Sequence, residues 1–535
     1  MRQIYHNGTV YGGQDTAFSG FIVENGIITH TGPDVETMVQ KEDEVIDLEG
    51  RFVCAGFNDS HMHLLNYGKV LYAAQLHEHT SSLAELLAYL KEYGRTHEKG
   101  WLTGRGWNQD YFADTDRMPD RHDLDTVSLD RPVMITRACG HVVSVNSEAL
   151  ALAGIDEHTP DPSGGRIGRK DGVPDGILYE NAISLLDAVL PVPDEEQLRQ
   201  MILLAAHAVN SCGITSVQSD DYGVFPLPYT LINKVYQDLE KQGKLTVRVY
   251  EQCNLPDVHL LKDFIAHGRV TGTMFATGPL KLVADGSLGG RTAHLSRPYH
   301  DRPDTCGFSL FSQQQLAELV ETAHSAGMQC AVHAIGDACL DEVLSAIEKA
   351  ITKNPRKDHR HGIVHCQISR PDQLVKIRDL DLHVYAQSIF LDYDNHIVEK
   401  RVGKELAASS YSWKTLMASG VRVSNGSDCP VELPDVMKGM QCAVTRESTD
   451  GCGPYLREQA FTVAEALDSY TVNGAYASFQ EHAKGRIAPG YMADFTILDQ
   501  DPFAVSSHDL HAIKVHAVYL NGEKVYENRQ SDAVL

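Results

Sequence analysis

Short hydrophobic runs alternate with amphipathic segments through the middle of the chain. Eight of these runs are candidate strands, at residues 53–63, 213–220, 245–253, 280–286, 328–337, 361–367, 383–390 and 421–428. Between them lie helical segments such as residues 195–213 and 312–327, whose hydrophobic residues share one helix face and which end near a glycine. This alternation predicts an α/β fold with a parallel sheet, and eight strands are the number that closes a (β/α)8 TIM barrel.

The two ends of the chain have a different pattern. Short strands there are separated by Asn-Gly pairs, which favour tight hairpin turns, at Asn7-Gly8, Asn25-Gly26 and Asn521-Gly522. We expect residues 1–54 and 484–535 to form one small β-sandwich domain outside a barrel domain of residues 55–483. About 150 residues separate the first two barrel strands, far more than one crossover helix needs. We therefore expect an inserted, lid-like α/β subdomain at about residues 75–185.

Composition narrows the class of protein. The formal net charge of −25 over 535 residues argues against nucleic acid or an anionic membrane surface as a partner. The N-terminal residues carry no hydrophobic core of a secretory signal, and no hydrophobic run reaches the roughly 20 residues that a membrane span needs. The eleven cysteines are scattered without a C-x-x-C pair, which is typical of reduced thiols. We predict a soluble cytoplasmic protein.

Ionisable residues stand at the ends of the predicted strands. His61 and His63 flank one methionine at the end of the first strand, so their side chains point to the same side. The later strands carry Lys281, His333, His365 and Asp428. In a closed barrel these strand ends surround one mouth, and imidazoles with a carboxylate suit zinc, with manganese, iron or nickel as alternatives.

Each of these residues also has a purely structural interpretation. A lone histidine in a barrel is more often a hydrogen-bonded core residue than a metal ligand. We assign that role to His207, His324, His383 and His396, which lie on predicted helices or away from the H-x-H pair. The coincidence of several ligand types at separate strand ends favours a metal site for the others.

Six longer motifs point to a known family. They are "GFNDSHMHL", "LKLVADGSLGGRTA", "VHAIGDACLDEVL", "HGIVHCQ", "GSDCPVE" and "GRIAPGYMADFTILD". With these motifs the chain resembles, over nearly its whole length, the YtcJ-like metal-dependent hydrolases of the amidohydrolase superfamily (amidohydrolase family 3). The resemblance implies a (β/α)8 barrel and a β-sandwich built from both termini.

The resemblance also implies a set of roles. His61 and His63 would hold one metal, His333 and His365 a second, and an N-carboxylated Lys281 would bridge two zinc ions. Asp428 would ligate the first metal and serve as general base and then general acid. The implied reaction is hydrolysis of a C–N bond in a small amide, N-acyl or N-formyl amine, or cyclic amide by a metal-bound hydroxide.

Further residues carry open alternatives. His141 matches a histidine that the family places near the substrate, and its alternative is a plain lid histidine. Arg291 could pair with a substrate carboxylate or phosphate, or form a salt bridge that fixes its loop. Trp107 and Tyr111 could line the substrate pocket or only pack the insertion.

Three rival functions remain. A deaminase of this superfamily usually has one metal and a glutamate three residues after the histidine of strand five, where this chain has Gly336. The other rivals are a non-catalytic regulatory protein that retains the fold and an ester hydrolase. The expected partner is a small-molecule substrate, without nucleic acid or membrane, and a homo-oligomer is left open.

Overall fold

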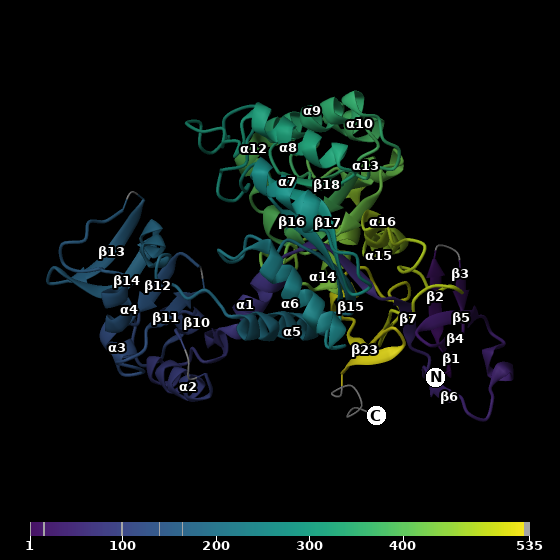
Figure 1. Ribbon diagram of the computed structural model, residues 1–535, viewed down its shortest axis with the longest axis horizontal. Coiled ribbons are helices and arrows are strands. Elements are labelled where there is room, and N and C mark those ends of the chain that lie inside the picture. The colour runs from purple at the N-terminus through teal and green to yellow at the C-terminus, as the bar shows by residue number, and fades with distance from the viewer. Residues whose placement is uncertain (1, 14–15, 98–99, 139, 163, 529–535) are drawn as a thin grey trace. The chain divides into compact units, whose positions relative to one another are not determined.

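The computed structural model describes residues 2–13, 16–97, 100–138, 140–162 and 164–528. The chain divides into two compact units, one of Met1–Asn66 with Ala205–Leu535 and one of Tyr67–Leu204. The first unit contains a parallel sheet of eight strands (Figure 1). In sheet order these are β8 (Phe57–Met62), β15 (Ile214–Ser219), β16 (Arg248–Asn254), β17 (Phe275–Val283), β18 (Cys330–Ala334), β19 (Gly362–His365), β20 (His383–Ala386) and β21 (Val423–Asn425). The (β/α)8 prediction is confirmed, and each of the eight strands overlaps its predicted segment.

The sheet is a nearly closed barrel, and side chains join its first strand to its last. Asp59 on β8 accepts hydrogen bonds from the backbone nitrogen of Ser427 at 3.1 Å and from its hydroxyl at 2.5 Å. Ser60 donates to the carbonyl of Asn425 at the end of β21. The backbone nitrogen of Asp428 donates to the carbonyl of His61 at 2.8 Å. These bonds fix the two strand ends that carry His61 and Asp428 next to each other.

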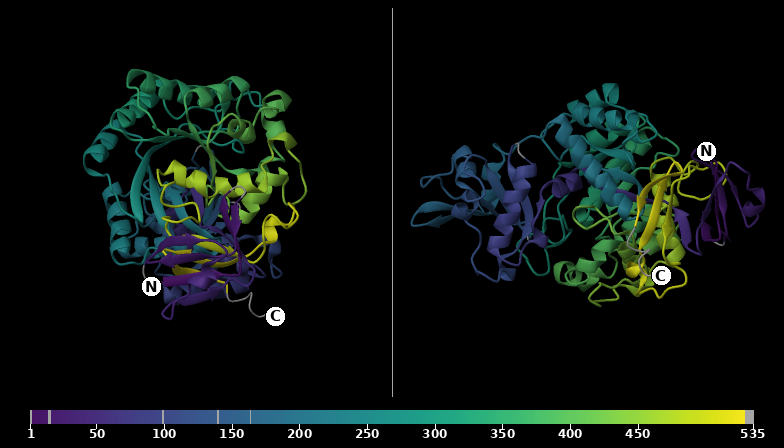
Figure 2. Two further views of the ribbon diagram at one scale, coloured as in Figure 1. Left: turned by 90° about the vertical axis from the view of Figure 1, so that its right-hand side faces the viewer. Right: turned by 90° about the horizontal axis from the view of Figure 1, so that it is seen from below.

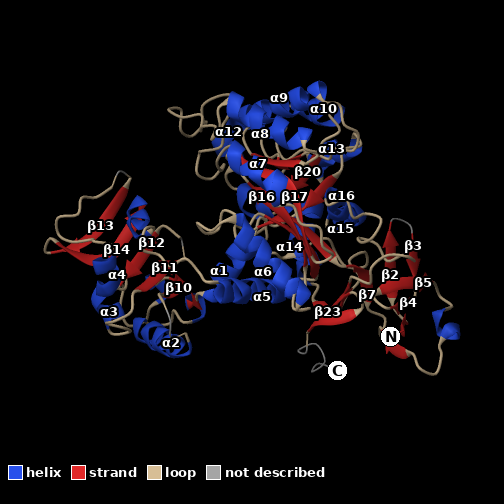
Figure 3. Ribbon diagram, in the orientation of Figure 1, coloured by secondary structure: helices blue, strands red, loops and turns tan. Residues whose placement is uncertain are grey.

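Helices surround the strands (Figures 2 and 3). They are α6 (Tyr229–Lys241), α7 (Val258–His267), α8 (Gln313–Ser325), α9 (Asp337–Lys353), α10 (Pro371–Asp379), α11 (Leu391–Asp394), α12 (Val398–Ala407), α13 (Trp413–Ala418), α14 (Val436–Thr445), α15 (Val463–Ser469) and α16 (Val472–Ala477). Helix α8 shows how the sequence sets them. Ser312 and Gln315 form a capping box at its start, and Leu316, Leu319 and Val320 bury one face at helical spacing.

The predicted first strand differs from the structure, because it is two strands. Residues Phe52–Ala55 form β7, which pairs with β2 and β22 outside the barrel, and β8 begins at Phe57. The change of sheet falls at Gly56. A Cβ atom there would lie only 2.2 Å from Oγ1 of Thr215 on β15, so the close approach of these two barrel strands requires glycine.

The chain termini form two further sheets in the first unit. One has the order β5 (Ile27–Thr31), β4 (Phe21–Glu24), β1 (Arg2–His6), β6 (Glu44–Asp47), and the other β24 (Glu523–Glu527), β23 (Val515–Leu520), β22 (Phe495–Leu498), β7, β2 (Thr9–Gly13), β3 (Thr16–Phe18). Tyr5 and Phe21 from the first sheet pack with Phe495 and Tyr519 from the second in one buried core. Both sheets thus share a hydrophobic interior, as a β-sandwich does.

The second unit is built between β8 and β15. Helix α1 (Leu64–Tyr72) leads into it and α5 (Glu195–Ser211) leads out. Its sheet has the order β13 (Gly165–Lys170), β14 (Val173–Glu180), β12 (Val142–Val145), β11 (Val133–Arg137), β10 (Leu102–Trp107), β9 (Ala74–Gln75), accompanied by α2 (Leu83–Thr96), α3 (Arg121–Asp125) and α4 (Ser147–Leu152). Leu86, Leu102 and Ile135 belong to one of its own buried clusters. An inserted α/β subdomain after the first barrel strand is therefore present.

Two expectations concern the chain as a whole. The cysteines in the described ranges all carry free thiols, and most of them are buried. No described helix combines the length and the hydrophobicity that crossing a membrane would require.

Candidate metal centre

Each barrel strand has at least one polar residue at or near its carboxyl end, and one from each strand is considered as a group. In sheet order these residues are His61, Asp220, Gln252, Lys281, His333, His365, Gln387 and Asp428. All eight are buried or nearly so. The carboxyl ends of parallel barrel strands meet at one mouth, so these side chains gather around one point.

Three of the predicted ligands form the centre of this group. In the described part of the chain, one ligand atom each from His61, His365 and Asp428 lies within 4.8 Å of the others. Nε2 of His61 and Nε2 of His63 lie 3.2 and 3.1 Å from the same oxygen, Oδ1 of Asp428. The ring of His333 lies 4.5 Å from that of His365, centroid to centroid. The four predicted histidines and Asp428 are therefore close together.

The backbone is strained at two members of the centre. His365 and Asp428 have φ angles of 74° and 57°, in the left-handed region that side chains other than glycine rarely adopt. Such residues cost about 1–3 kcal/mol each and cluster at functional sites. The surrounding barrel holds both side chains in place despite this cost.

Backbone carbonyls orient two of the histidines. Nδ1 of His63 lies 2.9 Å from the carbonyl oxygen of Asp220, and Nε2 of His333 lies 3.1 Å from that of Gly286. A carbonyl oxygen only accepts, so the nitrogen facing it carries the proton. The nitrogens left to face a metal ion are then Nε2 of His63 and Nδ1 of His333. Gln252 and Gln387 stand in the corresponding place beside His61 and His365.

The local charges favour neutral imidazoles at His61 and His365, a protonated imidazole at His63 and an ionised carboxylate at Asp428. Burial lowers the pKa of His61 to about 4, and burial together with His333 holds the pKa of His365 well below its usual range. Burial opposes ionisation of Asp428, but hydrogen bonds with His61 and His63 outweigh it and keep its pKa well below the usual value. Burial also lowers the pKa of His63, yet its bond to Asp428 outweighs this and raises that pKa to about 9. The Asp428 carboxylate thus attracts positive charge to this spot.

Lys281 is a buried member of the same group. Its side chain is 1% exposed, and Nζ lies 3.4 Å from Oδ2 of Asp220, which also lies near Nδ2 of Asn254. Asp220 is not among the predicted site residues. Its position directly after β15, in "VQSD", is the signal that could have found it, since Asp428 was recognised from the same kind of position.

Asp285 is a second carboxylate that is not among the predicted site residues. It is fully buried and accepts hydrogen bonds from the backbone nitrogens of Ile335 and Gly336 at 3.0 and 2.8 Å. Its Oδ1 lies 3.2 Å from Nε2 of His333. Asp285 therefore connects the loop after β17 with the strand end that carries His333.

The weaker predicted site residues make contacts of their own. Arg291 forms a two-point pair with Asp301, at 3.1 Å from Nε and 2.9 Å from Nη2. His141 belongs to the inserted unit, where its side chain is 68% exposed and Nδ1 lies 2.9 Å from Glu180. In the same unit Trp107 is fully buried in the core, and Tyr111 is exposed.

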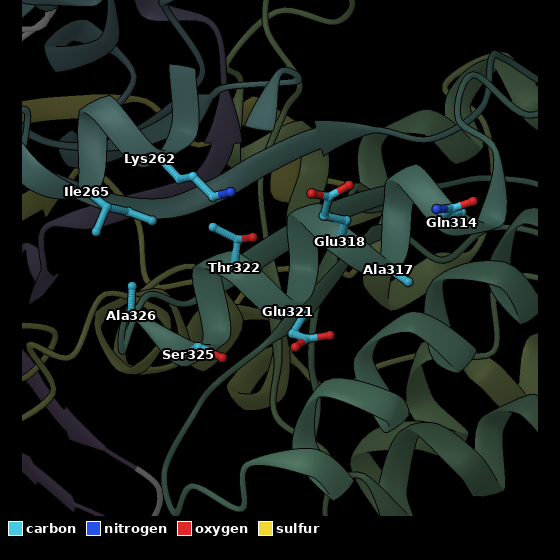
Figure 4. Close-up of a pocket in the computed structure, with 9 residues that line it drawn as sticks. All are labelled: Lys262, Ile265, Gln314, Ala317, Glu318, Glu321, Thr322, Ser325 and Ala326. Carbon is cyan, nitrogen blue, oxygen red and sulfur yellow. The ribbon is translucent and has the colours of Figure 1, made fainter. Parts of the chain in front are cut away.

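One surface groove lies away from the strand ends. It has a volume of about 880 Å³ and runs between α7 and α8 on the outside of the barrel (Figure 4). Lys262, Glu318 and Glu321 are among its lining residues, and it contains none of the predicted ligands. The groove is therefore separate from the metal centre.

Comparison with known proteins shows which family the chain belongs to. The sequence profile of the amidohydrolase family matches residues 44–526. The chain belongs to the amidohydrolase family. It is 35% identical to the amidohydrolase YtcJ of Bacillus subtilis (strain 168), over 98% of this chain and all of that one. It is 26% identical to an N-substituted formamide deformylase of Arthrobacter pascens, over 95% of each chain.

A solved structure extends the likeness to three dimensions. The crystal structure of a metal-dependent hydrolase from Pyrococcus furiosus matches with a TM-score of 0.78 and 29% identity, over 94% of this chain and all of that one. The protein is thus a metal-dependent hydrolase of the amidohydrolase family, with a barrel whose strand ends gather a set of metal-ligand side chains.

Proposed function

We propose that the protein hydrolyses the C–N bond of a small amide, N-acyl or N-formyl amine, or cyclic amide, using two zinc ions held at the barrel mouth. The observation that carries this proposal is the convergence of His61, His63, His365 and Asp428 on one buried point. Such a group of ligands has no structural use that a hydrophobic core could not serve better.

The donor set fits divalent metal ions. His61 and His63 with Asp428 offer one set of ligands, and His333 with His365 offers a second set beside it. Imidazole nitrogens and carboxylate oxygens are common zinc ligands. Buried Lys281 would join the two sets after its ammonium group loses a proton and the amine adds CO2 with release of a second proton, which gives an anionic carbamate. This assignment follows the family resemblance.

The chemistry that bound metals would supply is well defined in general terms. A divalent ion lowers the pKa of a coordinated water towards neutrality and polarises a carbonyl group for attack. The side chains of the chain itself do the rest.

Asp428 is the residue we propose for proton transfer. Burial raises the pKa of Asp428, but hydrogen bonds with His61 and His63 outweigh burial and hold this pKa well below the usual range. The carboxylate is therefore ionised at neutral pH and can accept a proton. The carboxyl group so formed would then donate that proton to the leaving amine. Its side chain is 11% exposed, which leaves it reachable from the barrel mouth.

The relatives support a C–N bond as the target. An N-substituted formamide deformylase is similar over nearly the whole chain, so N-formyl amines are the first substrates to try. Deamination is disfavoured because Gly336 occupies the position of the glutamate that such enzymes use. A Cβ atom there would lie 2.1 Å from the carbonyl oxygen of His294, which leaves no room for a larger side chain.

The test is an assay panel with matched variants. Wild-type protein supplied with Zn²⁺ is assayed on N-formyl amines, N-acyl amines, lactams, esters and amino-heterocycles. We expect turnover on a C–N substrate, and we expect Asp428→Asn to lower kcat by about 10²–10⁴-fold while metal stays bound. Asp392→Asn is the control, because Asp392 pairs with Lys438 instead. Turnover of esters or amino-heterocycles alone, or full activity in Asp428→Asn, would overturn the proposal.

A further inference from the structure

Two buried glutamines contact the histidines of the metal centre. We propose that Gln252 and Gln387 are positioning residues that fix the orientation and tautomer of His61 and His365, and that each sets the affinity for one of the two metals. This inference rests on the proposed function, since it concerns the same two-metal site. Both glutamines are at most 1% exposed, so water does not compete for their amide groups.

The hydrogen bonds of Gln252 define which way its amide faces. Its Nε2 donates to the carbonyl oxygen of Ser60 at 3.0 Å, and its Oε1 lies 2.7 Å from Nδ1 of His61. A backbone carbonyl only accepts, so the amide nitrogen must face Ser60 and the amide oxygen must face His61. An amide oxygen also only accepts, so Nδ1 of His61 carries the proton. Nε2 of His61, which faces Asp428, is then the nitrogen left for a metal ion.

Gln387 repeats this arrangement on the other side of the centre. Its Nε2 donates to the carbonyl oxygen of Tyr385 at 3.0 Å, and its Oε1 lies 2.7 Å from Nδ1 of His365. The same reasoning puts the proton of His365 on Nδ1 and leaves Nε2 free for a ligand. Two glutamines from different strands therefore impose the same tautomer on two different histidines.

The four histidines divide into two kinds. His63 and His333 are held by backbone carbonyls, which no substitution of a side chain removes, and His333 also lies 3.2 Å from Oδ1 of Asp285. His61 and His365 are held by glutamine side chains. In the proposed assignment each metal has one histidine of each kind, so replacing one glutamine should loosen one metal and spare the other.

Glutamine suits this position for an electrostatic reason. A carboxylate would also accept the hydrogen bond of the imidazole, but it would add a negative charge to a buried site that already contains Asp220 and Asp428. An amide holds the ring without adding charge, and its second hydrogen bond to a backbone carbonyl prevents it from turning over. A residue that hydrogen-bonds to a metal-ligating histidine typically contributes about 10–100-fold to the affinity for the metal.

Gln218 provides a matched control. It is fully buried on β15, and its Nε2 donates to the carbonyl oxygen of Gly474 at 3.0 Å, but in the described part of the chain its Oε1 has no hydrogen-bond partner. Gln252→Met, Gln387→Met and Gln218→Met are nearly equal in volume and each leaves one buried carbonyl without its donor. Only the first two also remove the acceptor from a histidine.

The experiment titrates metal-free wild-type and variant proteins with Co²⁺ and follows both binding heat and the visible absorption of the bound ion. We expect Gln252→Met and Gln387→Met each to weaken one of the two binding steps by about 10–100-fold and to change the absorption spectrum. Gln218→Met should bind within about threefold of wild type. Gln252→Glu, which keeps an acceptor for Nδ1 of His61, should bind at least as tightly as wild type.

Several results would overturn the inference. Wild-type affinity in both Gln252→Met and Gln387→Met would show that the glutamines do not position the ligands. An equal loss in Gln218→Met, or a loss in Gln252→Glu as large as in Gln252→Met, would assign the effect to general destabilisation. These outcomes leave the proposed function standing, whereas a wild-type protein that binds no Co²⁺ would overturn both.

Discussion

Nζ of Lys281 lies 3.4 Å from Oδ2 of Asp220, and both side chains are almost fully buried. An ammonium group at Lys281 would be paired with Asp220, whereas the proposed carbamate would place a new anionic group among the histidines. The state of this lysine therefore decides whether the centre can hold two bridged metals.

Substitution of Lys281 tests the proposed bridge. We expect Lys281→Ala to lower kcat by about 10²-fold or more, because two cations would then lose the anion between them. The cavity left by alanine gives room for a small carboxylate, so added acetate or propionate should restore part of the activity. Lys281→Met fills that cavity and should not be restored. A Lys281→Ala variant with wild-type activity, or with no response to carboxylates, would argue against a carbamate.

A chain of buried histidines should make stability depend on pH. The backbone nitrogen of Cys330 donates to Nδ1 of His361 at 2.9 Å, so Nε2 of His361 donates to Nδ1 of His324 at 2.8 Å, and His324 donates in turn to the carbonyl of Asn354. Burial holds the pKa of His361 well below its usual range. The folded state therefore favours the neutral ring. Its contribution is present above the unfolded pKa of about 6.5 and is lost as pH falls below that value.

The measurement compares wild type with His361→Gln by urea unfolding between about pH 7.5 and pH 5. Wild type should lose up to about 1.4 kcal/mol of unfolding free energy per pH unit more than the variant over this range. Replacing His361 leaves the more distant buried histidines unchanged, so their contributions cancel in the difference. A stability difference that does not change with pH would contradict this prediction.

A buried ion pair joins the barrel to the segment before β22. Nε and Nη2 of Arg248 on β16 lie 2.6 and 3.0 Å from the carboxylate of Asp494, and both side chains are at most 4% exposed. Arg248→Met leaves a buried carboxylate without its partner, so we expect a loss of about 3–5 kcal/mol in unfolding free energy. The double variant Arg248→Met/Asp494→Leu should recover part of it. Equal stability of wild type and Arg248→Met would show that the pair is dispensable.

The pair between Arg291 and Asp301 bears on the role of Arg291. The carboxylate of Asp301 accepts hydrogen bonds from two nitrogens of the Arg291 guanidinium and also pairs with Arg401. These three residues therefore fix the loop after β17. We expect Arg291→Met and Asp301→Asn to alter kcat/KM by similar factors on substrates with and without a carboxylate. A selective loss on carboxylate substrates in Arg291→Met alone would instead assign Arg291 to substrate binding.

The fold could be predicted because its signals are local. Hydrophobic runs of strand length, helices that end at glycines and Asn-Gly turns each reflect nearby residues, and they identified all eight barrel strands. The break at Gly56 could not be predicted, because it depends on Thr215, which is distant in the sequence. The clustered side chains could be singled out because histidine, lysine and aspartate are costly inside a barrel without a partner, and their role as metal ligands stays a prediction.

The residues around the ligands could not be found in the same way. Gln252 and Gln387 are neutral, and nothing in the sequence distinguishes them from Gln218, which is equally buried. What separates them is the contact of each with an imidazole, and that contact exists only after the strands have paired. Asp220 and Asp285 were missed although both follow barrel strands, since a single aspartate after a strand is also common in turns.

The metal content of the purified protein tests the central claim most directly. Protein produced with Zn²⁺ in the medium and freed of loosely bound ions is analysed for metals by mass spectrometry. The proposed centre predicts about two divalent ions per chain, falling to about one in a variant that lacks both His61 and His63. A wild-type protein that carries no metal, or one whose metal content is unchanged when both histidines are replaced, would contradict the account.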